Sequence, residues 1–163
     1  LLLQKSGRKL VPSDPEDPNS ELIEISEPFD FFVSSHGGSA VEMFGVYDVM
    51  RQIRENMPIY TIGIGKVMSA GTLLLAAGTK GERRIGRFCR VMIHGVVSGQ
   101  HGHLADIENE FDEAKMTQSM YVQALAEETS MTEKYLRNLI KKKSNIYISA
   151  QEAVDLGIAD III

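Results

Sequence analysis

The sequence predicts an α/β fold in which most strands run parallel. Segments typical of a strand, a glycine-rich turn and a helix follow one another along the chain, which is the pattern that builds parallel sheets. The 163 residues, 44% of them hydrophobic, suffice for one domain with a buried core but are few for two. We therefore expect one α/β domain.

The first part of the chain contains a polar segment followed by two strands and a helix. Residues 4–20 hold three of the five prolines together with Asp, Ser and Gly, which predicts a loop or mobile arm. The segments FDFFVSS (29–35) and IYTIGIG (59–65) predict strands. Between them, apolar side chains recur at helical spacing, which predicts a helix over about residues 40–54.

The second part contains a turn, two strands and a long helix. GERRIG (81–86) predicts a turn, and RVMIH (90–94) and IADIII (158–163) predict strands. A long amphipathic helix is expected over residues 104–127, because apolar side chains follow one face. The members of this stripe are Leu104, Ile107, Phe111, Ala114, Tyr121 and Leu125.

Two later helices carry start signals. Ser130 with Glu133, and Ser149 with Glu152, have the spacing of a capping box, in which the two side chains satisfy each other's backbone N–H groups. Gly157 is placed to end the second of these helices. We therefore expect one helix to start at each serine.

Composition limits the class of protein. The net charge of −5 argues against a nucleic-acid partner, which requires a surplus of Lys and Arg. The single Cys89 excludes an internal disulfide and a cysteine-rich zinc site, which favours a reducing compartment. The apolar runs are too short to span a bilayer, and the opening LLL lacks the pattern of a signal peptide. These features predict a cytoplasmic protein without a membrane or metal partner.

A serine stands out in the stretch GKVMSAGTLLLAAGTKG (65–81). Ser69 lies where the second strand ends and a short apolar helix begins, the place where functional groups gather in α/β folds. The N–H of the next residue, Ala70, could stabilise a developing oxyanion there. The simpler alternative is that Ser69 only caps the helix.

Two further features lie at strand ends. Gly37 and Gly38 follow the first strand, and adjacent glycines allow backbone amides to approach a ligand closely, although a plain tight turn is the simpler interpretation. His94 ends the third strand, where a lone histidine is more often structural. Ser69, His94 and the glycines together supply a nucleophile, a base and oxyanion donors at one sheet edge. The pattern indicates a hydrolase site.

These motifs resemble the ClpP family of self-compartmentalised serine peptidases. The resemblance rests on VSSHGGSA, GKVMSAGTLLLAAGTKGERRIG, RVMIHG and SAQEAVDLGIAD, and on the spacing of 25 positions from Ser69 to His94. It covers residues 29–163, which would form the peptidase domain after an N-terminal arm of residues 1–28. The fold implied is the ClpP/crotonase type, a ββα superhelix with a protruding handle helix at about residues 104–127.

The resemblance implies roles for individual residues. Ser69 matches the nucleophile and His94 the general base. Gly38 and the amide of Ala70 match the oxyanion hole, which Gly37 helps to shape. The members of the strand that pairs with substrate backbone would be Gly95, Val96 and Val97.

It also implies an assembly. Family members form two stacked seven-membered rings, and an AAA+ unfoldase of the ClpX, ClpA or ClpC type feeds them unfolded polypeptide. The peptidase itself needs no cofactor. By this resemblance the chain is a serine endopeptidase subunit, in the cytoplasm of a bacterial or virus-infected cell or in a plastid stroma.

The third member of the family's catalytic triad departs from the pattern. Asn145 stands where an aspartate is expected, and an asparagine can accept a hydrogen bond but supplies no charge to the imidazolium. Asp155 and Asp160 follow, but by position they belong to the last helix and strand.

His36 replaces the usual proline before the glycines, and we expect it to be a solvent-facing turn residue.

Two alternatives remain. Asn145 favours a weakly active or inactive ring subunit that assembles with an active paralogue. A crotonase-like enzyme acting on acyl-CoA thioesters shares the fold, although the spacing of Ser69 and His94 argues against it.

His101 and His103 suggest a metal site, but two histidines without a clear third ligand more often indicate a polar loop.

Overall fold

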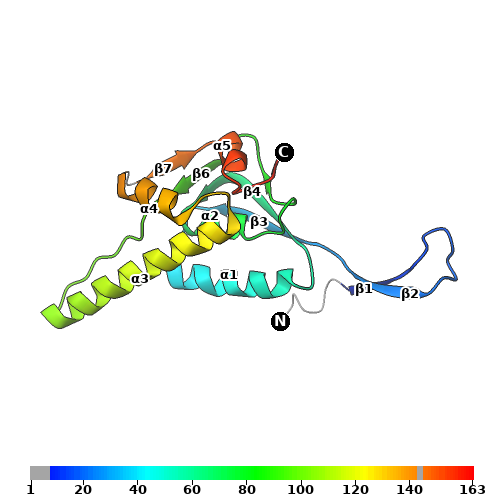
Figure 1. Ribbon diagram of the computed structural model, residues 1–163, viewed down its shortest axis with the longest axis horizontal. Helices are drawn as coiled ribbons and strands as arrows, with labels where there is room; N and C mark the ends of the chain where they lie inside the picture. The colour runs from blue at the N-terminus through cyan, green and yellow to red at the C-terminus, as the bar shows by residue number, and fades with distance from the viewer. Residues whose placement is uncertain (1–7, 143–144) are drawn as a thin grey trace.

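The computed structural model describes residues 8–142 and 145–163. Within this part, eight strands and five helices alternate along the chain (Figure 1). The strands are β1 (Arg8–Pro12), β2 (Leu22–Ser26), β3 (Phe29–Ser35), β4 (Ile59–Met68), β5 (Arg84–Ile85), β6 (Arg90–Ile93), β7 (Ile146–Ile148) and β8 (Ile161–Ile162). The helices are α1 (Ala40–Arg54), α2 (Ala70–Ala76), α3 (Leu104–Glu128), α4 (Glu133–Lys142) and α5 (Ala150–Asp155).

One curled sheet of six strands organises the domain. Its order is β7-β6-β4-β5-β8, with β3 also pairing to β4, and every pairing is parallel except that of β6 with β7. The predicted α/β class is therefore confirmed, and the arrangement accords with the ClpP fold. Parallel strands end at a common edge, so the turns after β3, β4 and β6 come together there.

The core lies between this sheet and helices α1, α2 and α3. Leu73 and Leu75 of α2, Ile85 of β5, Ile93 of β6 and Leu125 of α3 are fully buried. Each such side chain contributes roughly 1.5–3 kcal/mol through the apolar surface it removes from water. The short helix α2 is thus fixed on several sides, and with it the junction at its first turn.

The N-terminal region differs from the loop expected over residues 4–20. Strands β1 and β2 form an antiparallel hairpin that extends away from the body of the domain (Figure 1). The polar, proline-containing residues between them form the turn, which is closed by the Ser13 N–H donating to the Glu21 carbonyl at 2.8 Å. The prediction was wrong for residues 8–12 because prolines at the turn concealed a short strand whose partner comes ten residues later.

A second correction concerns the predicted turn GERRIG. Arg84 and Ile85 within it form strand β5, which pairs in parallel with both β4 and β8. A two-residue strand is too short to show a hydrophobic pattern, so only the neighbouring strands reveal it.

Of the two predicted capping boxes, one forms. Ser149 accepts the Glu152 N–H, and the Glu152 carboxylate accepts the Ser149 N–H at 2.8 Å, as predicted. Ser130 does not cap α4, because that helix begins at Glu133 and the Thr132 hydroxyl accepts the Tyr135 N–H instead. The spacing of a capping box therefore marked this helix start two residues early.

The long helix α3 divides into an anchored half and a projecting half. Tyr121 and Leu125 are buried, as the predicted stripe requires. Leu104 and Phe111, at the other end of the same stripe, are 72% and 61% exposed. Figure 1 shows why: the first half of α3 extends past the body of the domain, where no other described helix or strand covers it and only the loop after β6 runs beside it.

Candidate active site

Ser69 occupies an unusual backbone conformation between β4 and α2. Its dihedral angles are φ 55° and ψ −119°, and it is the only non-glycine residue with positive φ in residues 8–142 and 145–163. Its side chain makes no capping hydrogen bond to the helix. Such strained conformations persist only where the surroundings impose them, and they concentrate at functional sites. The simple helix-cap interpretation of Ser69 is therefore wrong.

Three hydrogen bonds hold the Ser69 backbone in place. Its N–H donates to the Met92 carbonyl of β6 at 2.7 Å. Its carbonyl accepts the Thr72 N–H at 2.9 Å and the Tyr121 hydroxyl at 3.1 Å. Strand, helix and the distant α3 thus all fix the same residue, and the strained geometry is built into the fold.

Gly37 can only be a glycine because Ser69 lies against it. Its φ is +106°, and a Cβ there would come within 2.6 Å of the Ser69 Cβ. The Gly37 N–H is fixed by the Ser35 hydroxyl at 3.1 Å. At Gly38, by contrast, a Cβ would meet nothing within 4 Å, so the chain turns from tight packing to open space in one residue.

Two backbone amides are left free beside the serine. The N–H groups of Gly38 and Ala70 donate no hydrogen bond to the described residues. Ala70 is the first residue of α2, where N–H groups have no partner inside the helix. A pair of unpaired donors next to a hydroxyl is the arrangement that stabilises a developing oxyanion.

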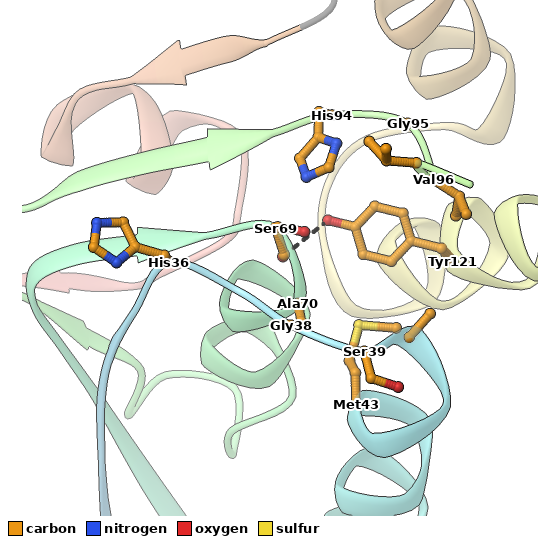
Figure 2. A pocket seen from close by; sticks show the side chains of 12 residues that line it. His36, Gly38, Ser39, Met43, Ser69, Ala70, His94, Gly95, Val96 and Tyr121 are labelled. Atoms are coloured by element: carbon orange, nitrogen blue, oxygen red, sulfur yellow. Dashed lines mark hydrogen bonds between the residues drawn. The ribbon is translucent and has the colours of Figure 1, made fainter. Parts of the chain in front are cut away.

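A cavity of about 280 Å³ joins these groups. It brings together the predicted residues Ser69, His94, Gly38, Ala70, Gly95, Val96 and Val97, and further contains His36, Ser39, Ala40, Met43 and Tyr121. Figure 2 shows the His94 ring beside Ser69, whereas the His36 side chain projects away from that pair. Residues that follow the ends of β3, β4 and β6 therefore meet at one edge, as the sequence predicts.

Some expected contacts are not formed in this chain. No hydrogen bond joins the side chains of Ser69 and His94 among the described residues. Asn145 is exposed and its side chain makes no hydrogen bond with a described residue, although continuing the β6–β7 register places it opposite His94. Asp160 is held by Arg83 at 2.6 Å, and exposed Asp155 accepts from Gln151, so neither reaches the pocket.

Sequence reasoning missed two residues of α3 that support the site. The Tyr121 hydroxyl reaches the Ser69 carbonyl, and burial raises the pKa of Tyr121 above its usual range. The Gln118 side-chain carbonyl accepts the Val96 N–H at 3.2 Å. The two lie three residues apart and so share one helix face, but only the apolar side of that face was visible as a pattern.

The described residues show neither a metal cluster nor a membrane-spanning helix. In the described part of the chain, no three His, Cys, Asp or Glu side chains gather in a way that could hold a metal ion. Helices long and apolar enough to cross a membrane are likewise missing from residues 8–142 and 145–163.

The strained serine, the neighbouring histidine and the two free amides are the combination typical of serine hydrolases, here on an α/β fold. The comparison with known families agrees with this class. The model of the Clp protease family matches residues 20–163, and the chain belongs to that family. It is therefore a member of a peptidase family, and its similarity to Clp protease proteolytic subunits identifies it as such a subunit.

Its relatives carry the same family name. ATP-dependent Clp protease proteolytic subunit 1 of Prochlorococcus marinus subsp. pastoris is 31% identical over 92% of this chain and 71% of its own length. ATP-dependent Clp protease proteolytic subunit 2 of a Synechococcus species is 28% identical over the same shares. Membership of the family implies, in general terms, association with Clp ATPases and assembly into an oligomer.

Proposed function

We propose that this chain is a serine endopeptidase in which Ser69 is the nucleophile and His94 the general base. The observation that carries the proposal is the strained backbone of Ser69. Its hydroxyl makes no capping hydrogen bond to α2, and the residue lines the same cavity as His94. Gly38 and Ala70 supply the oxyanion donors, and Gly37 admits the serine. Asn145 stands as the third member of this variant triad.

The reaction follows from these groups. The Ser69 Oγ attacks the carbonyl carbon of a peptide while His94 accepts the hydroxyl proton. The carbonyl oxygen becomes an oxyanion that accepts the Gly38 and Ala70 N–H groups. The C–N bond then breaks as His94 passes its proton to the leaving amine, and a water molecule releases the acyl group by the same steps in reverse order.

Gly95, Val96 and Val97 form the proposed substrate-binding segment. They follow β6 directly, line the same cavity and have no regular secondary structure of their own. An extended peptide could therefore pair with their backbone as an added strand. The half-buried Val96 is positioned by Gln118, which supports a fixed rather than a loose segment.

The proposed setting is a ring assembly. Residues 29–163 form the peptidase domain and residues 1–28 an arm, and two seven-membered rings enclose the sites. The exposed apolar side chains Leu104, Ile107 and Phe111 on the projecting half of α3 support this, because a second ring could cover them. An AAA+ unfoldase of the ClpX, ClpA or ClpC type would deliver unfolded polypeptide with ATP, in the cytoplasm.

Hydrolysis of a fluorogenic dipeptide and of casein tests the proposal. The purified chain should cleave both and should react with a fluorophosphonate at Ser69, whereas S69A should do neither. Adding an AAA+ partner and ATP should extend cleavage to folded substrates. Failure of the wild-type chain to label at Ser69 in assembled rings would overturn the proposal.

A second candidate is an inactive ring subunit that assembles with an active paralogue. The exposed Asn145, which makes no hydrogen bond with a described residue, favours it, since an asparagine supplies no carboxylate to orient His94. In a related triad, the Asp-to-Asn change lowers kcat by about 10⁴. If wild type is silent and N145D becomes active, this candidate is correct. Comparable activity of the two would remove its basis.

A further inference from the structure

The hydrogen bond from Tyr121 acts on a peptide group with two functions. The carbonyl that it touches belongs to Ser69, and the N–H of the same peptide group belongs to Ala70. A peptide group is planar and trans, so its C=O and N–H point in opposite directions. A donor on the carbonyl therefore fixes the direction in which the Ala70 N–H points.

The effect is electronic as well as geometric. Hydrogen bonds in a chain polarise one another, so a peptide that accepts at its oxygen becomes a better donor at its nitrogen. The Ser69 carbonyl accepts twice, from Thr72 inside α2 and from Tyr121 on α3. Only the second of these donors is a side chain that can be removed without breaking the helix.

The surroundings make Tyr121 a firm support. Its side chain is 5% exposed, and its ring lines the cavity beside Ser69 (Figure 2). Burial disfavours its charged form, so the hydroxyl keeps its proton and remains a donor. Tyr121 comes from a helix 52 residues further along the chain, so its contact adds a tertiary constraint to the strained turn.

We propose that Tyr121 is a positioning residue for the oxyanion hole, which orients and polarises the Ser69–Ala70 peptide through its hydroxyl. The inference rests on the proposed peptidase function. It assigns to α3 an indirect part in transition-state stabilisation. Tyr121 does not touch the reacting atoms; it acts through the Ala70 N–H.

The test is Y121F, which removes only the hydroxyl. Its matched control is Y47F, because Tyr47 is equally buried and its hydroxyl donates to Glu128 at 3.0 Å, away from the cavity. For each variant, kcat and KM are measured on a fluorogenic peptide, together with inhibition by a peptide boronate. The boronate forms a tetrahedral adduct on the serine and places an oxygen in the oxyanion hole. Thermal unfolding and gel filtration accompany both.

For Y121F we expect kcat to fall about tenfold with KM unchanged, and boronate affinity to fall by the same factor, less than the loss of a direct oxyanion donor. Y47F should keep both values within twofold even if its melting temperature falls. If wild type cleaves, S69A does not, and Y121F retains the wild-type kcat, the inference fails while the proposed function stands. If Y121F and Y47F lose activity only in proportion to their stability, Tyr121 is merely structural. A wild-type chain inert at Ser69 overturns the function and the inference together.

Discussion

Two serines in this molecule lie at the same kind of place and behave differently. Ser69 precedes α2 and Ser149 precedes α5, each directly after a strand. Ser149 has an extended backbone, φ −75° and ψ 168°, and its side chain takes part in a capping box with Glu152. Ser69 has φ 55° and ψ −119° and caps nothing.

The difference shows that the backbone, not the residue type, decides what a serine does. An extended conformation brings the hydroxyl beneath the exposed N–H groups of its helix, where it becomes a cap. The positive φ of Ser69 turns the hydroxyl away from them and leaves it for other chemistry. That conformation is imposed by the Met92 and Tyr121 contacts and admitted by Gly37, which lie elsewhere in the sequence.

The distinction between Ser69 and Ser149 is tested most directly by removing each hydroxyl in turn. S69A should lower kcat by about 10⁵-fold or more, because the loss of a serine nucleophile in another protease costs about 10⁶. S149A should leave kcat within twofold. Steady-state hydrolysis of a fluorogenic peptide at equal ring concentration checks both, and equal losses in the two variants would contradict the distinction.

A methyl group at Gly37 should disturb only the first serine. G37A combines a φ of +106° with a Cβ 2.6 Å from that of Ser69, so we expect kcat to fall about 10³-fold, as when an oxyanion donor is lost. G45A is the matched control. Gly45 lies inside α1 with no atom within 4 Å of an added Cβ, and alanine there should stabilise the helix by about 0.5–1 kcal/mol. If G37A kept the wild-type kcat, the prediction would be wrong, because the turn at Gly37 could then move away from Ser69 without loss of activity.

Breaking the ion pair at the base of α3, the helix that carries Tyr121, should lower the stability of the whole domain. Glu128 is 3% exposed and pairs with Arg54 at 2.8 Å, so E128Q should lower the free energy of unfolding by about 3 kcal/mol. Denaturation by urea measures this. R51Q is the control, because its ion pair with Glu127 is half exposed and should contribute less than about 1 kcal/mol.

Glu128 also gives this region a pH dependence with a defined sign. Burial opposes its charged form, but the hydrogen bonds and charge of Arg54 outweigh burial and lower its pKa. A carboxyl whose pKa is lower in the folded state stabilises above its unfolded value, about 4.3, and loses that contribution as pH falls through the folded pKa. The free energy of unfolding of the wild type should therefore decrease as the pH is lowered below about 4. In E128Q this dependence on pH should be weaker. An unchanged slope would contradict the assignment.

The smallest expected effect is on the stability supplied by Ser149. Replacing a capping serine by alanine typically costs about 1 kcal/mol, so S149A should lower the free energy of unfolding by about that amount. T132A, which removes the side-chain acceptor at the start of α4, offers a second cap of similar strength for comparison. A stability change near zero in S149A would mean that the capping box contributes nothing in this context.

Local patterns predicted those parts of the fold that depend on neighbouring residues. Helix α1 has its predicted bounds, and the Ser149 capping box formed, because periodicity and caps are local properties. Strand β5 and the hairpin of β1 and β2 were missed because short strands are defined by their partners. The start of α4 was misplaced because two candidate caps, Ser130 and Thr132, stand close together.

The candidate site divides in the same way. Ser69, His94 and Gly38 could be proposed because strand ends meet at a common edge, and they do share one cavity. Tyr121 and Gln118 could not be proposed, since their contacts join α3 to residues more than 20 positions away. The register places Asn145 opposite His94, but a hydrogen bond between the two would depend on a side-chain conformation that no sequence pattern encodes.

The anchored base and free outer half of α3 together form a lever. Its last turn is held at Glu128, Tyr121 lies about 10 Å from that point along the axis, and Leu104 about 36 Å. A tilt that displaces the outer end by about 3.5 Å therefore moves Tyr121 by about 1 Å. That is enough to stretch its 3.1 Å bond to Ser69 beyond hydrogen-bonding range. If α3 turned as a rigid rod about its last turn, a displacement of its far end would reach the peptide beside the nucleophile reduced about threefold.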